Sequence, residues 1–265
     1  MKKAIYILLG LLINQLAIAQ CGTDEYNKRL VQDKLKEGQH YLDYLHEREN
    51  FEYQVEYDAK TKKATRVIPV VFHVVHAYGE ENISKEQIED QMRIINEDFQ
   101  KKNADTSETR AYFKGRAANM EIEFKLARIA PDGSCTEGIT RTYDPVNTIE
   151  DYDDNDNEVK AAVTPWDRNK YLNVWVVTTI QSNREGTILG YAQFPSQGAA
   201  TDGVVVIHDR VGTIGSARAV DAGRTLTHEI GHWLGLYHPF QGGCTNISSR
   251  TDQVDDTPPV DEPSY

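Results

Sequence analysis

Three histidines and one glutamate near residue 230 have the types and spacing of a metal-dependent hydrolytic site. His228 and His232 are four residues apart, so on a helix both imidazoles leave the same face and can bind one metal ion. Glu229 lies one step round that helix, where its carboxylate can reach a water in the metal's open position. Gly235 can take a left-handed conformation that ends the helix, and His238 can then return as a third nitrogen ligand. Three neutral imidazoles and one water are typical of a catalytic zinc ion rather than a closed structural one.

The full pattern is much more specific than its first half. A bare His-Glu-x-x-His occurs by accident in many chains, where its histidines only cap or solvate a helix. Here a glycine and a third histidine follow at fixed offsets, and typical composition gives all five matches a chance on the order of 10⁻⁵ to 10⁻⁴. By contrast, His73, His76 and His208 lie in or beside apolar strands without partner spacing. We interpret these three as structural.

A helix must carry this pattern, and the residues around it can start and bury one. Asp221 is a candidate N-cap. Four apolar residues at helical spacing can pack inward: Leu226, Ile230, Trp233 and Leu234.

The preceding residues predict the elements that support this helix. Residues 67–75 form a nearly continuous β-branched run, typical of a strand buried on both faces. Ser84 and Gln87 form a capping-box pattern that begins a second helix, with Ile88, Met92, Ile95 and Phe99 on its apolar face. Strands are also predicted over 121–129, 171–177 and 204–207, and the acidic residues 151–158 are predicted to form a solvated loop. Strands and helices alternating over one core predict an α+β fold.

Residues 1–19 have the features of a secretory signal peptide. Lys2 and Lys3 form a basic start, Ile5 to Leu12 is a short apolar run, and Ala17 to Ala19 supplies the small residues that a signal peptidase recognises. The run is shorter than the ~20 apolar residues of a membrane span, which disfavours the alternative of a membrane anchor. The sequence therefore predicts an exported protein without a stable membrane span.

Residues 20–65 are polar and charged, with weak helical periodicity. We interpret them as a removable pro-segment with an exposed basic cleavage site near residues 57–66; the alternative is an N-terminal helical decoration. At Arg66 the composition changes, so residues 66–265 are predicted to form the catalytic domain.

The overall composition excludes several classes of function. A net charge of −12 disfavours a nucleic-acid partner, because phosphate binding requires clustered Lys and Arg. Three cysteines cannot build a disulfide framework. The sequence gives no indication of the oligomeric state.

The pattern from His228 to His238 is that of metzincin metalloproteases, and the flanking phrases are similar to those of the pappalysin (cytophagalysin) family. The resemblance implies a metzincin-type fold with a twisted mixed sheet, a backing helix and an active-site helix. It also implies zinc on the three histidines, Glu229 as catalytic base, and protein or peptide substrates that pair with a strand near Leu189 to Phe194. The resembling phrases are residues 66–75, 171–175, 189–195, 202–205, 241–244 and 256–258.

Two features depart from the family's pattern. Metzincins have a methionine-containing turn beneath the zinc, whereas the methionines here are Met1, Met92 and Met120. Relatives also place the floor of the S1′ pocket beyond the motif and pair the cysteine after it with a later one, which Cys244 lacks. The resemblance therefore implies a truncated C-terminal subdomain, which leaves the activity and P1′ preference of this chain open.

The resemblance further implies a mechanism of latency. Cys21-Gly22-Thr23 resembles the cysteine switch of some relatives, in which a thiolate takes the zinc position that the catalytic water needs. A disulfide from Cys21 to Cys135 or Cys244, and a lipid on Cys21, are the alternatives. Relatives cleave before basic residues, which implies self-cleavage before Arg66 and a basic residue at P1′.

Relatives also bind calcium near residues 252–257. Carried over, this implies Asp252, the Asp255 carbonyl and Thr257 as candidate oxygen ligands; the alternative is an acidic surface loop.

The sequence thus predicts a secreted zinc endopeptidase made as a zymogen. Three other functions stay open: a zinc-dependent hydrolase of a non-protein substrate, an exported binding module that keeps a zinc site without turnover, and a purely structural exported domain.

Overall fold

The computed structural model describes residues 19–36, 65–153, 157–183, 186–195, 197–241, 243–244, 252, 254, 257–258 and 260–261. The predicted signal peptide up to residue 18, residues 37–64 of the predicted pro-segment, and Asp255 lie outside these residues. Within the described part, no helix has the length and apolar character needed to cross a bilayer.

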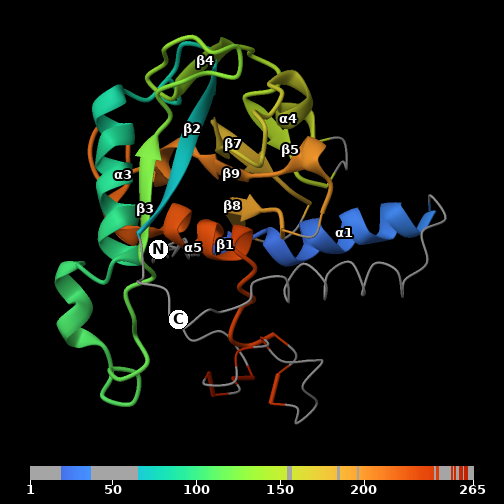
Figure 1. The fold of residues 1–265 in the computed structure, drawn as a ribbon. Helices are drawn as coiled ribbons and strands as arrows, with labels where there is room; N and C mark the ends of the chain where they lie inside the picture. The colour runs from blue at the N-terminus through green and yellow to red at the C-terminus, as the bar shows by residue number, and fades with distance from the viewer. Residues whose placement is uncertain are drawn as a thin grey trace, which may run out of the picture.

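A mixed sheet forms the centre of the molecule (Figure 1). Its strand order is β1-β8-β9-β6-β2-β3, with β4 also paired to β2 beyond the end of β3. Neighbouring strands are parallel except β8 and β9, which are antiparallel. The strand bounds are β1 Ala19–Cys21, β2 Arg66–His76, β3 Ile122–Leu126, β4 Ile139–Tyr143, β6 Leu172–Val177, β8 Thr187–Ala192 and β9 Val204–Ile207.

Helices α3 (Lys85–Phe99) and α5 (Arg224–Trp233) cover one face of this sheet. The α3 helix begins as predicted, because the Ser84 hydroxyl accepts the Gln87 amide at 3.1 Å. Its apolar face and two buried residues of α5, Leu226 and Ile230, share one core with alternate residues of β2, β6 and β9. The predicted α+β class with a backing helix and an active-site helix is confirmed.

The opposite face of the sheet has a second core, which includes Trp175, Tyr152 and Tyr191. Helix α4 (Glu158–Ala162) and a small parallel sheet of β5 (Ile149–Asp151) and β7 (Thr179–Gln181) lie on this side. A side chain from the N-terminal segment completes this core: Tyr26 of helix α1 (Thr23–Lys36) is 2% exposed.

Two of the predicted elements have different bounds or burial. The strand predicted over 121–129 ends at Leu126, where the Ala127 amide bonds the Val70 carbonyl and the chain turns away. The prediction of a solvated acidic loop over 151–158 is wrong in part. Asp151 belongs to β5, and Tyr152 and Asn157 are buried, because they contact the second core rather than solvent.

His73 is a buried histidine of the central strand, as the sequence predicted. Its ring is 1% exposed and lies 2.8 Å from the Thr140 hydroxyl and 3.0 Å from the Asn173 side-chain oxygen. Burial lowers its pKa from 6.5 to about 4, so the folded protein keeps the ring neutral.

We expect His73 to make the free energy of unfolding fall as the pH falls from about 6.5 to 4. In that window the unfolded chain binds a proton that the folded chain rejects, which removes up to about 3 kcal/mol of stability. Urea unfolding of wild type and His73→Gln at pH 7, 5.5 and 4.5 measures this. The stability advantage of wild type should shrink with falling pH, since groups common to both proteins cancel; a constant difference would contradict the assignment.

Candidate metal centre

Helix α5 starts two residues later than a cap at Asp221 would place it. The N-cap is Gly223, whose φ of +72° is a conformation that favours glycine, and Asp221 lies in a short 3-10 turn. The prediction of Asp221 as N-cap is therefore wrong. Its carboxylate instead accepts the Gly223 amide at 3.2 Å and the Thr225 hydroxyl, which fixes the turn that leads into the helix.

Polar contacts at both ends hold α5 in place. Near its start, Arg224 forms two hydrogen bonds to the Asp105 carboxylate at 2.5 and 2.7 Å. The Thr227 hydroxyl donates to Asp98 of α3 at 2.8 Å. At its end, the Trp233 indole donates to buried Asp202 at 3.1 Å. These contacts fix the rotation of the helix and hence the direction of its polar residues.

The turn predicted at Gly235 ends the helix. Gly235 has φ +100°, its amide donates to the His232 carbonyl at 2.8 Å, and the Leu236 amide donates to the Gly231 carbonyl at 3.0 Å. This pair of bonds is a Schellman motif. The chain reverses there and carries His238 back beneath the helix.

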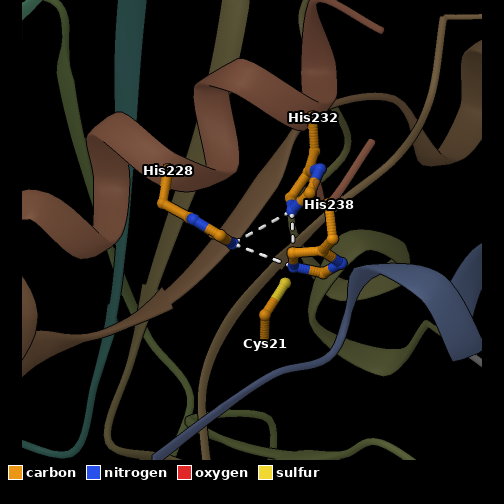
Figure 2. Close-up of side chains that lie close together, drawn as sticks. All are labelled: Cys21, His228, His232 and His238. Atoms are coloured by element: carbon orange, nitrogen blue, oxygen red, sulfur yellow. Dashed lines mark hydrogen bonds between the residues drawn. The ribbon is translucent and has the colours of Figure 1, made fainter. Parts of the chain in front are cut away.

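The three histidines converge on one point, as Figure 2 shows. Their Nε2 atoms form a triangle with sides of 3.0 Å (His228 to His232), 3.2 Å (His232 to His238) and 3.2 Å (His228 to His238). Tetrahedral ligation at the usual Zn–N distance separates nitrogens by about 3.3 Å. The triangle therefore has the dimensions of one face of a zinc tetrahedron.

Hydrogen bonds at the far sides of two rings fix their tautomers. The Nδ1 atom of His232 lies 2.6 Å from the Leu236 carbonyl, and that of His238 lies 3.0 Å from the Asp24 carboxylate. Both partners can only accept, so both Nδ1 atoms carry the proton and both Nε2 atoms are unprotonated. Burial and the neighbouring imidazoles lower the pKa of His228 to about 4 and of His232 to about 3. Two lone pairs facing each other at 3.2 Å repel unless a cation lies between them, so the residues fit a metal ion.

The Cys21 thiol lies beside this triangle of nitrogens. The sulfur and the three imidazole ligand atoms all lie within 4.8 Å of one another. Cys21 forms no disulfide among the described residues, so the predicted alternatives with Cys135 and Cys244 do not occur in this structure. Burial, and the Glu229 carboxylate beside it, raise the pKa of the thiol well above its usual range. A bound cation reverses this effect, because a coordinating thiol loses its proton.

Glu229 follows His228 on α5, and its carboxylate lies beside the Cys21 thiol. Its carboxylate is buried, at 1% exposure, and accepts the Thr23 hydroxyl at 2.7 Å and the Cys21 thiol at 3.7 Å. Burial raises its pKa to about 7, although these hydrogen bonds oppose the change. Gly190 of β8 packs directly against it: a Cβ at that position would lie 3.1 Å from the Glu229 Cγ.

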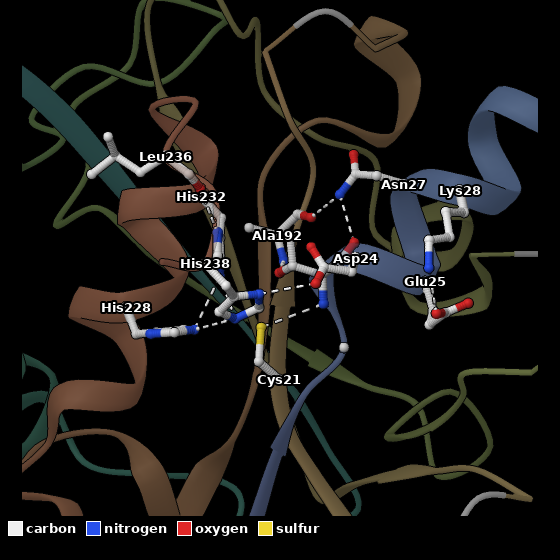
Figure 3. Close-up of polar contacts among 12 residues, drawn as sticks. Cys21, Asp24, Glu25, Asn27, Lys28, Ala192, His228, His232, Leu236 and His238 are labelled. Carbon is white, nitrogen blue, oxygen red and sulfur yellow. Dashed lines mark hydrogen bonds and ion pairs between the residues drawn. The ribbon is translucent and has the colours of Figure 1, made fainter. Parts of the chain in front are cut away.

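A short run of N-terminal residues completes the site (Figure 3). The sequence predicted Cys21 beside the histidines, but not the contacts of Thr23, Asp24 and Asn27. β1 pairs with the outer side of β8 in parallel, and the Gly22 amide donates to the Gly190 carbonyl at 3.0 Å. Thr23 accepts the Ala192 amide at 2.9 Å. The strand that the resemblance assigned to substrate pairing is therefore covered.

Asn27 continues this cover with its side chain. Its carboxamide donates to the Ala192 carbonyl at 3.0 Å and accepts the Phe194 amide at 2.9 Å, as a peptide group of a neighbouring strand would. The only sequence signal for this role is its place six residues after Cys21, on the helical face that also carries Thr23.

The predicted calcium ligands lie only partly within the described residues. Asp252 is buried, but its carboxylate accepts the Val254 amide at 3.2 Å, and the Thr257 amide donates to the Val254 carbonyl at 3.1 Å. These bonds form a local turn. Asp255 lies outside the described residues, so the proposed ligand set is not assembled by them.

Comparison with known proteins gives the same assignment. The family model described as pregnancy-associated plasma protein-A matches residues 153–264. Mature mirolysin of Tannerella forsythia in complex with a cleaved peptide is 41% identical, with a TM-score of 0.65 over 74% of this chain and 73% of that one. The chain belongs to the pappalysin family. A promirolysin mutant from the same organism is 35% identical, with a TM-score of 0.70 over 89% of this chain and 75% of that one.

Curated relatives of this chain are named extracellular metalloproteases. The protein from Verticillium alfalfae is 34% identical over 207 residues, and the one from Coccidioides posadasii is 32% identical over 208. These matches cover 75% and 74% of the present chain, which spans 59% and 60% of the two relatives.

We expect Asn27→Leu to expose the outer side of β8. The Phe194 amide loses its acceptor, so its hydrogen exchange should accelerate by about tenfold or more, in line with the loss of a buried hydrogen bond. Lys28→Ala is the matched control, since the Lys28 side chain is exposed and forms an ion pair with Glu25 on the surface of the same helix. Hydrogen exchange of a peptide spanning residues 190–195 measures both. Equal exchange in the two variants would show that Asn27 does not protect the strand.

Proposed function

We propose that this chain is the zymogen of a secreted zinc endopeptidase, with zinc on His228, His232 and His238 and Glu229 as general base. The observation that carries the proposal is the meeting of unprotonated imidazole nitrogens within 3.2 Å, beside a buried carboxylate. Mirolysin with its cleaved peptide and the extracellular metalloproteases support peptide substrates and secretion.

The chemistry divides between the metal and the chain. Zinc, when bound, lowers the pKa of a water and polarises a carbonyl. Glu229 would accept a proton from that water and donate it to the leaving amine. The backbone groups of Gly190 and Ala192 hold an extended substrate along β8 once the N-terminal residues have left it.

Latency follows from three residues of the segment 21–24. Cys21 would take the fourth metal position. The Thr23 hydroxyl donates a hydrogen bond to the Glu229 carboxylate, and the Asp24 carboxylate lies 3.0 Å from the His238 Nδ1 atom. The segment thus blocks the metal's open position and the base together. We place the pro-segment at residues 20–65, after a signal peptide of residues 1–19, and the mature start at Arg66, by self-cleavage before a basic residue.

Further parts of the proposal rest on the family resemblance alone. A basic residue at P1′, and calcium bound by Asp252, the Asp255 carbonyl and Thr257, are predictions of this kind. Release of peptides from casein, abolished by a chelator, distinguishes the endopeptidase from a hydrolase of non-protein substrates and from a binding or structural module.

We expect Glu229→Ala to retain one zinc per chain and to lose proteolysis by several orders of magnitude, because Glu229 acts as base and not as ligand. It should also fail to convert itself to a form that starts at Arg66. Metal analysis, casein cleavage and N-terminal sequencing measure these three properties. Wild type without zinc, or a variant with undiminished cleavage, contradicts the assignment.

We expect Cys21→Ala to convert to the mature form markedly faster than wild type, since the metal's fourth position opens. X-ray absorption at the zinc edge should show one sulfur ligand in uncut wild type and none in the variant. Cys135→Ala is the control, because Cys135 is exposed and lies on a different loop. A zymogen whose zinc has only nitrogen and oxygen ligands would end the switch hypothesis, even if the variant matured faster.

A further inference from the structure

Tyr26 of the proposed pro-segment fills a pocket on the face of the sheet opposite the three histidines. Its ring packs against Tyr191, with centroids 4.6 Å apart. Its hydroxyl donates to the Asn157 side-chain oxygen at 2.5 Å and accepts from the Lys160 ammonium at 2.9 Å. Lys160 is 2% exposed and also donates to the Thr201 carbonyl at 2.7 Å. The pocket therefore recognises both parts of a phenol. Tyr191 contacts the ring, the Asn157 side-chain oxygen accepts the hydroxyl proton, and buried Lys160 donates to the hydroxyl oxygen.

The rest of the pocket belongs to the proposed catalytic part of the chain, whose own contacts hold its walls together. Trp175 of β6 lies below the Lys160 ammonium, 5.6 Å from ring centroid to nitrogen. The Tyr191 hydroxyl donates to Glu150, which also accepts the Val159 amide at 3.1 Å. None of these groups comes from residues 19–36, so the walls remain when that segment leaves.

The position of the pocket relates it to the proposed cleft. Successive residues of a strand face opposite sides of a sheet. Gly190 faces Glu229, and Tyr191 faces the Tyr26 pocket. A peptide paired along the outer side of β8 would likewise point alternate side chains toward the metal site and toward this pocket.

The register of β1 on β8 indicates how far the Tyr26 pocket lies from the bond that would be cleaved. Cys21 pairs with Gly190, whereas Asn27, the neighbour of Tyr26, bonds Ala192 and Phe194. Those two residues lie two and four positions further along the chain, or roughly 7 to 13 Å in an extended strand.

We propose that the vacated Tyr26 pocket is a substrate subsite that receives a tyrosine side chain, two to four residues from the cleaved bond on the Ala192–Phe194 side. The inference rests on the proposed peptidase function. Tyrosine is favoured over phenylalanine because a ring without a hydroxyl leaves the buried Lys160 ammonium with one acceptor fewer. Tyrosine is favoured over aliphatic residues because Tyr191 and Lys160 both interact with a π face.

The first test examines phenol recognition without any proteolysis. In the full chain, Tyr26→Ala should leave a cavity that p-cresol fills and stabilises, as measured by thermal unfolding, whereas toluene stabilises less. The difference between the two compounds should vanish when Lys160→Met is added. Tyr26→Leu serves in the same way if the alanine variant does not fold. Equal stabilisation by both compounds without the lysine change would overturn the assignment of Lys160 as the recognising group.

The second test examines substrates with the matured protein and a peptide library read by mass spectrometry. Wild type should cleave sequences with tyrosine at one position two to four residues from the cut about tenfold better than those with phenylalanine there, the size expected for a hydrogen bond to a charged donor. Lys160→Met should bring the ratio of tyrosine to phenylalanine cleavage close to one, and this ratio does not depend on the overall activity of the variant. Lys170→Met is the control, because the Lys170 side chain is 71% exposed.

The outcomes separate the two proposals. Cleavage without a tyrosine preference, or a preference unchanged in Lys160→Met, overturns the subsite alone. Failure of matured wild type to cleave any peptide overturns the peptidase function, and the subsite as a substrate site with it.

Discussion

The lone pairs of imidazole nitrogens that face one another are the constraint on which the rest of the site depends. His232 and His238 each give their one proton to an acceptor on the far side of the ring, so their Nε2 atoms meet unprotonated at 3.2 Å. Such an arrangement is unfavourable in a dry site without a cation. The surrounding chain must therefore hold the rings in place, and the metal proposed here supplies the compensating charge.

The fold meets this requirement by fixing one short helix at both ends. Contacts from Thr227 to Asp98 and from Trp233 to Asp202 set its rotation, and its apolar side is buried in the larger core. Because Gly190 lacks a side chain, β8 approaches the helix closely enough for Glu229 to lie between them. The metal-facing residues and the strand proposed to bind substrate thus share one rigid frame.

The N-terminal segment is as much a part of this frame as the helix. From Cys21 to Asn27 it contacts the metal-facing point, the base, a histidine and the backbone of β8, and Tyr26 enters the second core. While the chain is intact these contacts are intramolecular, which gives them a high effective concentration. The proposed cleavage would remove that connection and leave the contacts themselves unchanged, so a single cut would convert a stable cover into one that can dissociate.

The sequence alone determined the features that depend on near neighbours. The spacing of His228 and His232, the reversal at Gly235, the Ser84 cap and the buried strands follow from helical and strand periods and from local backbone preferences. Only the tertiary structure decided which distant residues complete the site. Thr23 lies 206 positions from Glu229, and their contact depends on the parallel register of β1 on β8. It also corrected Asp221, whose neighbour Gly223 takes the cap in a left-handed conformation, and it placed Cys21 beside the histidines instead of in a disulfide. Contacts of this kind depend on the path of the whole chain, which no local pattern encodes.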